Sequence, residues 1–314
     1  MNDFLALVGP TASGKTALSL ALAESLGAEI ISMDSRQVYR GMDIGTAKVT
    51  AAERGDIPHH GLDLVDPDQR YSAGQFARDA RSWMAGIRAR GRVPLVVGGT
   101  GFFLRALQEP IFSEPELDPI RVEALRRYLK DVDRERLEAW VRLLDPERAP
   151  LALEGGPQRM SRTLEVALLS GKPLSLWHRE APPVGVPLRG VVVALEMPTD
   201  EVDRRVELRV TRMLEAGFVE EVRALLAKGY SPEAPGMTGT GYREMARHLA
   251  GDTTLEEAAR EIALRTRQYA RRQITWFRHQ LPPETVRIDA TAPLGTQVAC
   301  CLDAWNDANT EEDG

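Results

Sequence analysis

Cysteine is scarce in this 314-residue sequence: Cys300 and Cys301 are the only two, and they are adjacent. Neighbouring cysteines rarely bridge, so the sequence favours a reducing compartment over a disulfide-bonded secreted fold. No Cys and His spacing matches a zinc site, so we expect no zinc. No apolar run approaches the roughly 20 residues that span a bilayer, and no basic leader precedes the first apolar segment. We therefore expect a cytoplasmic protein with no membrane partner.

Basic residues are not in excess either. The 40 lysines and arginines stand against 46 acidic residues, which gives a formal net charge of −6. This balance argues against a protein coated in basic charge, but it leaves room for a local basic groove. The length and the 43% apolar content suit two domains, or one large domain with an insertion.

A glycine-rich stretch, Gly-Pro-Thr-Ala-Ser-Gly-Lys-Thr over residues 9–16, lies between an apolar run and a helix-forming run. This order is typical of a phosphate-binding loop between a strand and a helix. Glycines let backbone N–H groups point at phosphate oxygens beside a helix N-terminus. Lys15 adds positive charge, and the Thr16 hydroxyl can bind Mg²⁺. The pattern predicts a di- or triphosphate site and does not identify the ligand as ATP.

Two further apolar segments, 28–33 and 94–97, end in polar residues. We expect an α/β fold in which a parallel sheet flanked by helices resembles the P-loop NTPases, with ligands beyond the carboxyl ends of the strands. Asp34, after the first segment, is either a site acid or an N-cap. The second segment ends in Gly98-Gly-Thr100 rather than in the acid that usually holds Mg²⁺ in P-loop ATPases.

Residues 110–187 have a different character, with charged helical segments separated by prolines. We interpret them as a helical insertion between two parts of the core, 1–109 and 188–302, and we expect the acidic tail 303–314 to be disordered. Helices are predicted at about 120–130, 134–144 and 157–169. Most arginines here are typical of a solvated face.

A long helix is predicted from 255 to 279, and its residues 260–279 hold six arginines against one glutamate, with aromatic residues between them. In an acidic protein this indicates a nucleic-acid surface, although an amphipathic core helix is the alternative. Another helix, capped by Thr199 or Asp200, places Arg209 at the margin of its apolar face. That guanidinium requires an anion, which is either a carboxylate or a ligand phosphate.

These motifs together resemble the bacterial tRNA dimethylallyltransferase (tRNA isopentenyltransferase) family. Two departures stand out, since Val49 replaces a usual Pro and Phe103 an often-found Tyr. The zinc-finger extension of eukaryotic members is absent. The matching stretches occur in the family's order along most of the chain: 9–16, 34–39, 42–48, 58–60, 98–100, 158–162, 241–243 and 272–276.

The resemblance implies that dimethylallyl diphosphate binds the loop and that the N6 amine of the adenosine 3′ of the anticodon accepts the dimethylallyl group. Asp34 would be the general base, Thr100 would hold the base or the leaving group, and Lys15 and Arg209 would neutralise the diphosphate with Mg²⁺ on Thr16. The helical insertion would grip the tRNA anticodon stem-loop, and we expect a monomer. The implied diphosphate-binding residues are Gly9, Pro10, Thr11, Ala12, Ser13, Gly14, Lys15 and Thr16.

The implied tRNA contacts fall on four segments and two single positions. They are Asp34, Ser35, Arg36, Gln37, Thr100, Arg121, Gln158, Arg159, Met160, Ser161, Arg162, Thr238, Gly239, Thr240, Gly241, Tyr242, Arg243, Arg271, Arg272, Gln273, Ile274, Thr275, Trp276, Phe277 and Arg278. The alternatives are a P-loop small-molecule kinase, a free-adenylate isopentenyltransferase and a non-catalytic RNA-binding protein. The kinase explains residues 9–16 but neither the basic helix nor the large insertion, and the RNA-binding protein would not need Lys15 or Asp34.

Overall fold

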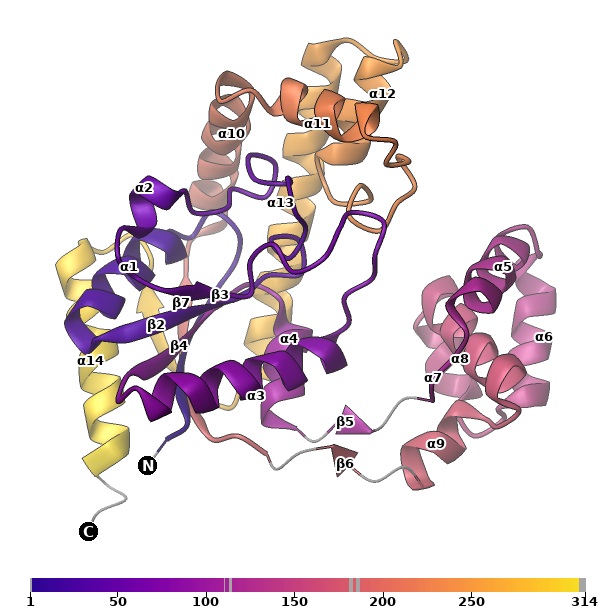
Figure 1. Cartoon of the computed structure of the whole chain (residues 1–314), viewed down its shortest axis with the longest axis horizontal. Coiled ribbons are helices and arrows are strands. Elements are labelled where there is room, and N and C mark those ends of the chain that lie inside the picture. Colours follow the sequence, from indigo (N-terminus) through magenta and orange to yellow (C-terminus); the bar gives the residue numbers. More distant parts are fainter. Residues whose placement is uncertain (1, 110, 113–114, 181–182, 185–186, 311–314) are drawn as a thin grey trace. The chain divides into compact units, whose positions relative to one another are not determined.

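A parallel sheet of six strands organises the first of two units in the chain. The strands are β1 (Phe4–Val8), β2 (Ala28–Met33), β3 (His59–His60), β4 (Val93–Gly98), β7 (Gly190–Glu196) and β8 (Val286–Asp289). Their order is β3-β2-β4-β1-β7-β8, with every pairing parallel (Figure 1). Strands β1 and β2 are buried along their whole length. Strand β1 is wholly apolar, as burial on both faces favours, whereas β2 includes Glu29, whose carboxylate pairs with Arg90 and His60. The predicted fold class is confirmed.

The computed structural model describes residues 2–109, 111–112, 115–180, 183–184 and 187–310. It divides the chain into one unit of residues 1–109 with 187–314, and a second unit of residues 110–186. No helix in these described ranges combines the length and apolar character needed to cross a bilayer.

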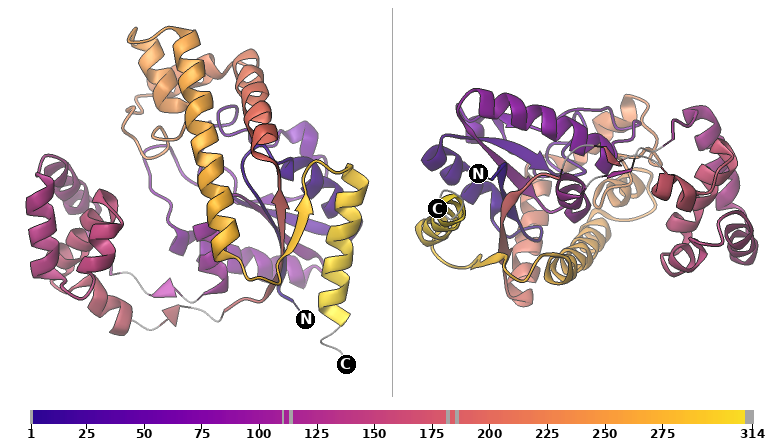
Figure 2. Two further views of the ribbon diagram at one scale, coloured as in Figure 1. Left: turned by 180° about the vertical axis from the view of Figure 1, so that it is seen from behind. Right: turned by 90° about the horizontal axis from the view of Figure 1, so that it is seen from below.

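Helices cover both faces of the sheet. Helices α1 (Lys15–Leu26) and α14 (Leu294–Thr310) pack together on one face, and α3 (Ala73–Ala89) and α4 (Gly101–Gln108) lie on the other (Figure 2). The Ser72 hydroxyl caps α3 by accepting from the Gln75 N–H at 3.1 Å. The helix start predicted there is therefore confirmed.

A second group of helices stands beyond the carboxyl ends of the strands in the same unit (Figure 1). Their bounds are α10 (Thr199–Glu215), α11 (Phe218–Ala227), α12 (Tyr242–Leu249) and α13 (Leu255–Gln280), whereas the short helix α2 (Ala51–Arg54) precedes the amino end of β3. Helix α13 packs against α10, α12 and α4. It is the long basic helix expected from the sequence, and it links the peripheral helices to the sheet.

Two expectations about helix ends are wrong. Helix α10 has Pro198 at its N-cap, without a side-chain cap, and acidic residues in its first turn face the helix dipole instead. The tail expected to be disordered from 303 is helical up to Thr310, because α14 packs on α1, β7 and β8. The Asn2 N–H also donates to Asn309 Oδ1 at 2.9 Å. Residues 311–314 lie outside the described residues.

The second unit is helical. It contains α5 (Pro119–Lys130), α6 (Arg134–Leu144), α7 (Ala149–Glu154), α8 (Pro157–Ser170), α9 (Leu174–Glu180) and an antiparallel pair, β5 (Ile111–Phe112) with β6 (Pro183–Val184). The three helices predicted in this region are confirmed. Val141, Met160 and Leu164 lie in its core, and Arg126 donates to both carboxylate oxygens of the buried Glu165.

We predict that Leu18→Ala destabilises the first unit, because Leu18 of α1 is completely buried against the sheet. Truncating it leaves a cavity, so the free energy of unfolding should fall by about 2–5 kcal/mol. Urea denaturation measures this change. Leu264→Ala is the matched control, since Leu264 is exposed on α13, and it should change stability by no more than about 0.5 kcal/mol. Equal losses in the two variants would contradict the assignment of the core.

Candidate active site

The glycine-rich loop connects β1 to α1 at the carboxyl edge of the sheet. Gly14 closes the loop with a left-handed φ of 88° and is the N-cap of α1, with no side chain bonded to the helix end. A residue with a β-carbon is strained at this φ. The first N–H groups of α1 and its dipole therefore face the loop, which is the arrangement that attracts an anion.

Lys15 folds back over this loop. Its Nζ donates to the carbonyl oxygens of Gly9 at 2.9 Å and Pro10 at 2.6 Å, and to Ser13 Oγ at 3.3 Å. Burial lowers the pKa of Lys15 to about 7; Asp34 opposes this shift and Arg209 adds to it. Among the described residues Lys15 has no ion pair with a carboxylate. An anion in the loop would supply the missing partner.

No carboxylate of the described residues supplies the anion expected for Arg209. Its guanidinium donates from Nη1 to Thr11 Oγ1 and from Nη2 to the Thr46 carbonyl oxygen, both at 3.2 Å, and within the described ranges it forms no ion pair. Burial lowers the pKa of Arg209, and Asp34 acts in the opposite direction. Of the two partners left open by the sequence, the structure favours a ligand phosphate.

The Thr46 carbonyl belongs to a turn that Glu221 of α11 holds in place. The Glu221 carboxylate accepts from the backbone N–H groups of Asp43, Ile44 and Gly45 at 2.8, 2.6 and 3.1 Å. The Tyr242 hydroxyl donates to the same carboxylate at 2.6 Å. Arg209 is thereby anchored at one end by the phosphate-binding loop and at the other by this turn.

Asp34 follows β2 at the same edge of the sheet as the loop. Its Oδ1 accepts from the N–H of Arg36 at 2.8 Å and, more weakly, from that of Gln37 at 3.4 Å. The capping role is therefore confirmed. Its other oxygen, Oδ2, makes no hydrogen bond to the described residues, so a substrate donor can bind there. Asp34 also affects the pKa values of Lys15 and Arg209, so the three groups are neighbours.

Thr100 begins α4 next to Asp34. Its Oγ1 accepts from the Ser35 N–H at 3.2 Å, and its side chain also bonds to Tyr269 of α13. Burial, followed by the charge of Asp34, raises the pKa of Tyr269 to about 12. Sequence analysis did not assign Tyr269 to the site. A signal was present, because residues 269, 273 and 276 follow the i, i+4, i+7 spacing of one helix face.

The predicted tRNA-contacting residues of this unit divide by exposure. Tyr242 is 1% exposed and packs edge-on against Phe218, and Phe277 is 4% exposed in the core. Both side chains fill the protein interior, so a contact of these two residues with tRNA stays a prediction. Gln273 is also buried, and Gly239 and Gly241 lie in the folded turn before α12. The exposed members are Thr238, Thr240, Arg243, Arg271, Arg272, Thr275 and Arg278.

The remaining predicted positions are partly buried or exposed. In the first unit Arg36 donates to the Pro235 carbonyl oxygen and Gln37 to that of Thr46, while Ser35, Ile274 and Trp276 are half-buried. In the second unit the Met160 side chain is fully buried, and its contact with tRNA stays a prediction. The other members there are the exposed Arg121, Gln158 and Arg159 and the half-buried Ser161 and Arg162.

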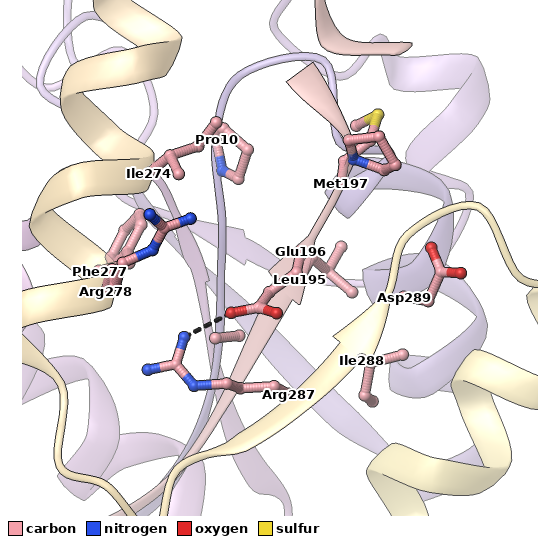
Figure 3. A pocket seen from close by; sticks show the side chains of 12 residues that line it. Pro10, Leu195, Glu196, Met197, Ile274, Phe277, Arg278, Arg287, Ile288 and Asp289 are labelled. Carbon is pink, nitrogen blue, oxygen red and sulfur yellow. Dashed lines mark hydrogen bonds and ion pairs between the residues drawn. The ribbon is translucent and has the colours of Figure 1, made fainter. Parts of the chain in front are cut away.

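A cavity of about 380 Å³ lies on the outer flank of the loop (Figure 3). Its lining includes Pro10, Met197, Ile274 and Phe277. Arg287 and Glu196 also line it and form an ion pair at 2.6 Å. Its lining includes none of the four predicted catalytic residues. This cavity therefore adjoins the phosphate-binding loop through Pro10 but does not contain those four residues.

The oxygen that the loop offers to a metal ion, the Thr16 hydroxyl, suits an ion that binds together with a phosphate ligand. In the described part of the chain no three His, Cys, Asp or Glu residues gather as a metal site. Thr16 is exposed at the first turn of α1. Mg²⁺ commonly keeps several waters and binds through one or two protein oxygens together with substrate phosphates, and a single hydroxyl beside a phosphate-binding loop fits that pattern.

Comparisons with known proteins agree on one family. The model described as IPP transferase matches residues 37–280, and that described as isopentenyl transferase matches residues 2–57. A tRNA dimethylallyltransferase of Roseiflexus sp. is 42% identical over 311 residues, covering 98% of this chain and all of the relative. One from Citrifermentans bemidjiense is 43% identical, covering 87% of this chain and 88% of the relative.

Solved structures give the same result. The tRNA isopentenylpyrophosphate transferase of Bacillus halodurans matches with a TM-score of 0.69 at 31% identity, over 98% of this chain and all of that one. A eukaryotic dimethylallyltransferase whose crystallographic snapshots show it acting on tRNA matches with a TM-score of 0.80 at 26% identity. That match covers 98% of this chain and 80% of the other.

We predict that Lys15→Met stabilises the ligand-free protein most at low pH. The pKa of Lys15 is about 7 in the native state and about 10.4 in an unfolded chain. The cost of burying the cation is therefore fully present below pH 7 and declines as the pH rises toward 10. The stability gain of the variant should shrink over this range by up to about 1.4 kcal/mol per pH unit.

Urea denaturation at pH 6, 8 and 9.5 measures this dependence. Lys228→Met is the control, because Lys228 is exposed at the end of α11. A constant difference between wild type and Lys15→Met across these pH values would show that the Lys15 amine is not buried as described.

Proposed function

Since the chain belongs to the tRNA dimethylallyltransferase family, we propose that it transfers a dimethylallyl group from dimethylallyl diphosphate to tRNA. The acceptor is the N6 amine of the adenosine 3′ of the anticodon, and the second product is diphosphate. One observation carries this proposal. Lys15 and Arg209, which have no carboxylate partner among the described residues, lie at one sheet edge with Asp34, whose Oδ1 is hydrogen-bonded.

The leaving group defines the first part of the site. Diphosphate oxygens would replace the loop carbonyls around Lys15 Nζ and accept hydrogen bonds from Arg209 and from the N–H groups that begin α1. Negative charge grows on the diphosphate as the allylic C–O bond breaks, and fixed positive groups stabilise that charge. Mg²⁺ held by Thr16 and the diphosphate would supply further positive charge.

The acceptor defines the second part. The N6 nitrogen attacks the allylic carbon, a C–N bond forms, and the proton lost from the amine passes to Asp34. The capping bonds to Oδ1 fix the carboxylate and leave Oδ2 for the amine. Thr100, held against Ser35, borders the same space. The adenine must leave its stack to reach this depth, as in other enzymes that modify bases.

RNA binding would involve exposed basic residues. We propose that Arg272 and Arg278 of α13, together with Arg243, contact the phosphate backbone, and that the arginine and glutamine side chains of the second unit, Arg121, Gln158 and Arg159, contact the anticodon loop. These residues are exposed. Phosphate contacts of this kind make affinity fall steeply with salt. We propose that the protein acts as a monomer.

The alternatives explain less of the molecule. A small-molecule kinase would use the loop and Asp34 but not the helical second unit. A free-adenylate isopentenyltransferase would share the chemistry but would have no use for that unit, which lies within the matched length of the curated relatives. No feature of the described residues favours either.

We predict that the purified protein transfers label from radioactive dimethylallyl diphosphate to tRNA with adenosines 3′ of its anticodon. Free AMP and a tRNA with guanosine at the target position are the controls. Gel separation and scintillation counting measure incorporation. Label on AMP rather than on tRNA would overturn the assigned acceptor.

We also predict that Asp34→Asn keeps the capping acceptor but removes the base, so that kcat for transfer falls by about 100- to 10,000-fold. Inorganic diphosphate should bind at least as tightly as to wild type, because a negative charge near the anion site is removed. Asp56→Asn, at an exposed position, should retain wild-type turnover. An unchanged kcat in Asp34→Asn would exclude Asp34 as the base.

A further inference from the structure

Gln273 connects the basic helix to the phosphate-binding loop. It lies on α13 and is 7% exposed, although Arg271 and Arg272 beside it are exposed. Its Oε1 accepts from the Thr11 N–H, and its Nε2 donates to the Gly99 carbonyl oxygen, both at 2.8 Å. One amide therefore bridges the loop after β1 and the turn after β4.

The bridge is part of a closely fitted contact between α13 and the turn at 99–101. A β-carbon on Gly99 would lie 2.2 Å from Gln273 Nε2, and one on Gly101 would lie 2.4 Å from the Trp276 ring. Thr100, between them, bonds to Tyr269. Because each residue of the turn meets a different side chain of α13, the helix cannot shift along the turn without breaking several of these contacts at once.

Thr11 receives a second contact from the other side. Arg209 of α10 donates to its Oγ1, while Gln273 accepts from its N–H. Helices α10 and α13 are also tied together, by Arg271 with Asp203 at 2.9 Å and Arg267 with Glu207 at 2.8 Å. The backbone of the loop is thus fixed by the same helix that carries the exposed arginines.

We propose that Gln273 is a positioning residue through which RNA bound to α13 and diphosphate bound in the loop strengthen each other's binding. The inference rests on the proposed function, because it requires RNA on α13. An amide is suited to this place, since it accepts at one end and donates at the other. RNA bound to α13 would hold this helix in place, and through Gln273 it would also hold Thr11 and Gly99. Diphosphate would then bind a loop that already has its binding conformation.

Calorimetric titration of inorganic diphosphate with Mg²⁺ into the full chain tests this, with and without a saturating anticodon stem-loop. In wild type the stem-loop should tighten diphosphate binding by at least about fivefold. In Gln273→Met, which keeps the length but removes both hydrogen bonds, this factor should fall to near one. The affinity for the stem-loop alone should remain that of wild type.

Gln268→Met is the matched control, because Gln268 is exposed on the same helix, and it should keep the wild-type coupling. If Gln273→Met does not fold, Gln273→Glu is used, which keeps the acceptor for Thr11 but loses the donor to Gly99.

A purely structural residue would lower the melting temperature without changing the coupling factor. Equal coupling in wild type and variant, with transfer to tRNA intact, overturns the inference alone. A wild-type chain that binds no stem-loop overturns the proposed function as well.

Discussion

The positive charge held at the phosphate-binding loop is the constraint on which the site depends. Lys15 and Arg209 are both partly buried, and in the described structure backbone carbonyl and hydroxyl oxygens take the place of carboxylate partners. Such an arrangement costs stability in the free protein, as the lowered pKa of Lys15 records. The same arrangement makes a polyanion the natural ligand, because the protein has already removed much of the water that would otherwise screen the charges.

The parallel sheet makes this arrangement possible. Because β1, β2 and β4 are neighbours and run in the same direction, the loop, Asp34 and Thr100 emerge at one edge although they are far apart in the chain. Helix α13 then closes over that edge, and two glycines of the turn at 99–101 are required by the closeness of its side chains. The chemistry of the site thus follows from the order of three strands and the fit of one helix.

Much of this could be predicted from local sequence. The strand-loop-helix pattern at 9–16 carries its own geometry, and the buried strands and most helices follow from apolar periodicity. The rest depends on long-range packing. A motif shows that Tyr242, Met160 and Phe277 belong to characteristic stretches, but not which way each side chain points, and all three lie in the interior.

Ala270, Gln273 and Phe277 have the i, i+3, i+7 spacing of one helix face and form a buried stripe on α13. A glutamine within such a stripe must find hydrogen-bond partners. Its partners, Thr11 and Gly99, are each more than 170 residues away, and no local pattern identifies them. The helical end of the chain was missed for the same reason, since a polar, acidic composition says nothing of the helix and strands against which it packs.

Glu221 holds the turn at 43–45 through main-chain N–H groups rather than through side chains. A contact of this type does not depend on which side chains the turn carries, since every amino acid except proline offers the same donor. The three donors of the turn would survive any substitution except proline, but Gly45 has no room for a side chain, since a β-carbon there would lie 2.4 Å from the Phe218 ring. The carboxylate at 221 is the shared acceptor for all three donors, so its loss would release the whole turn.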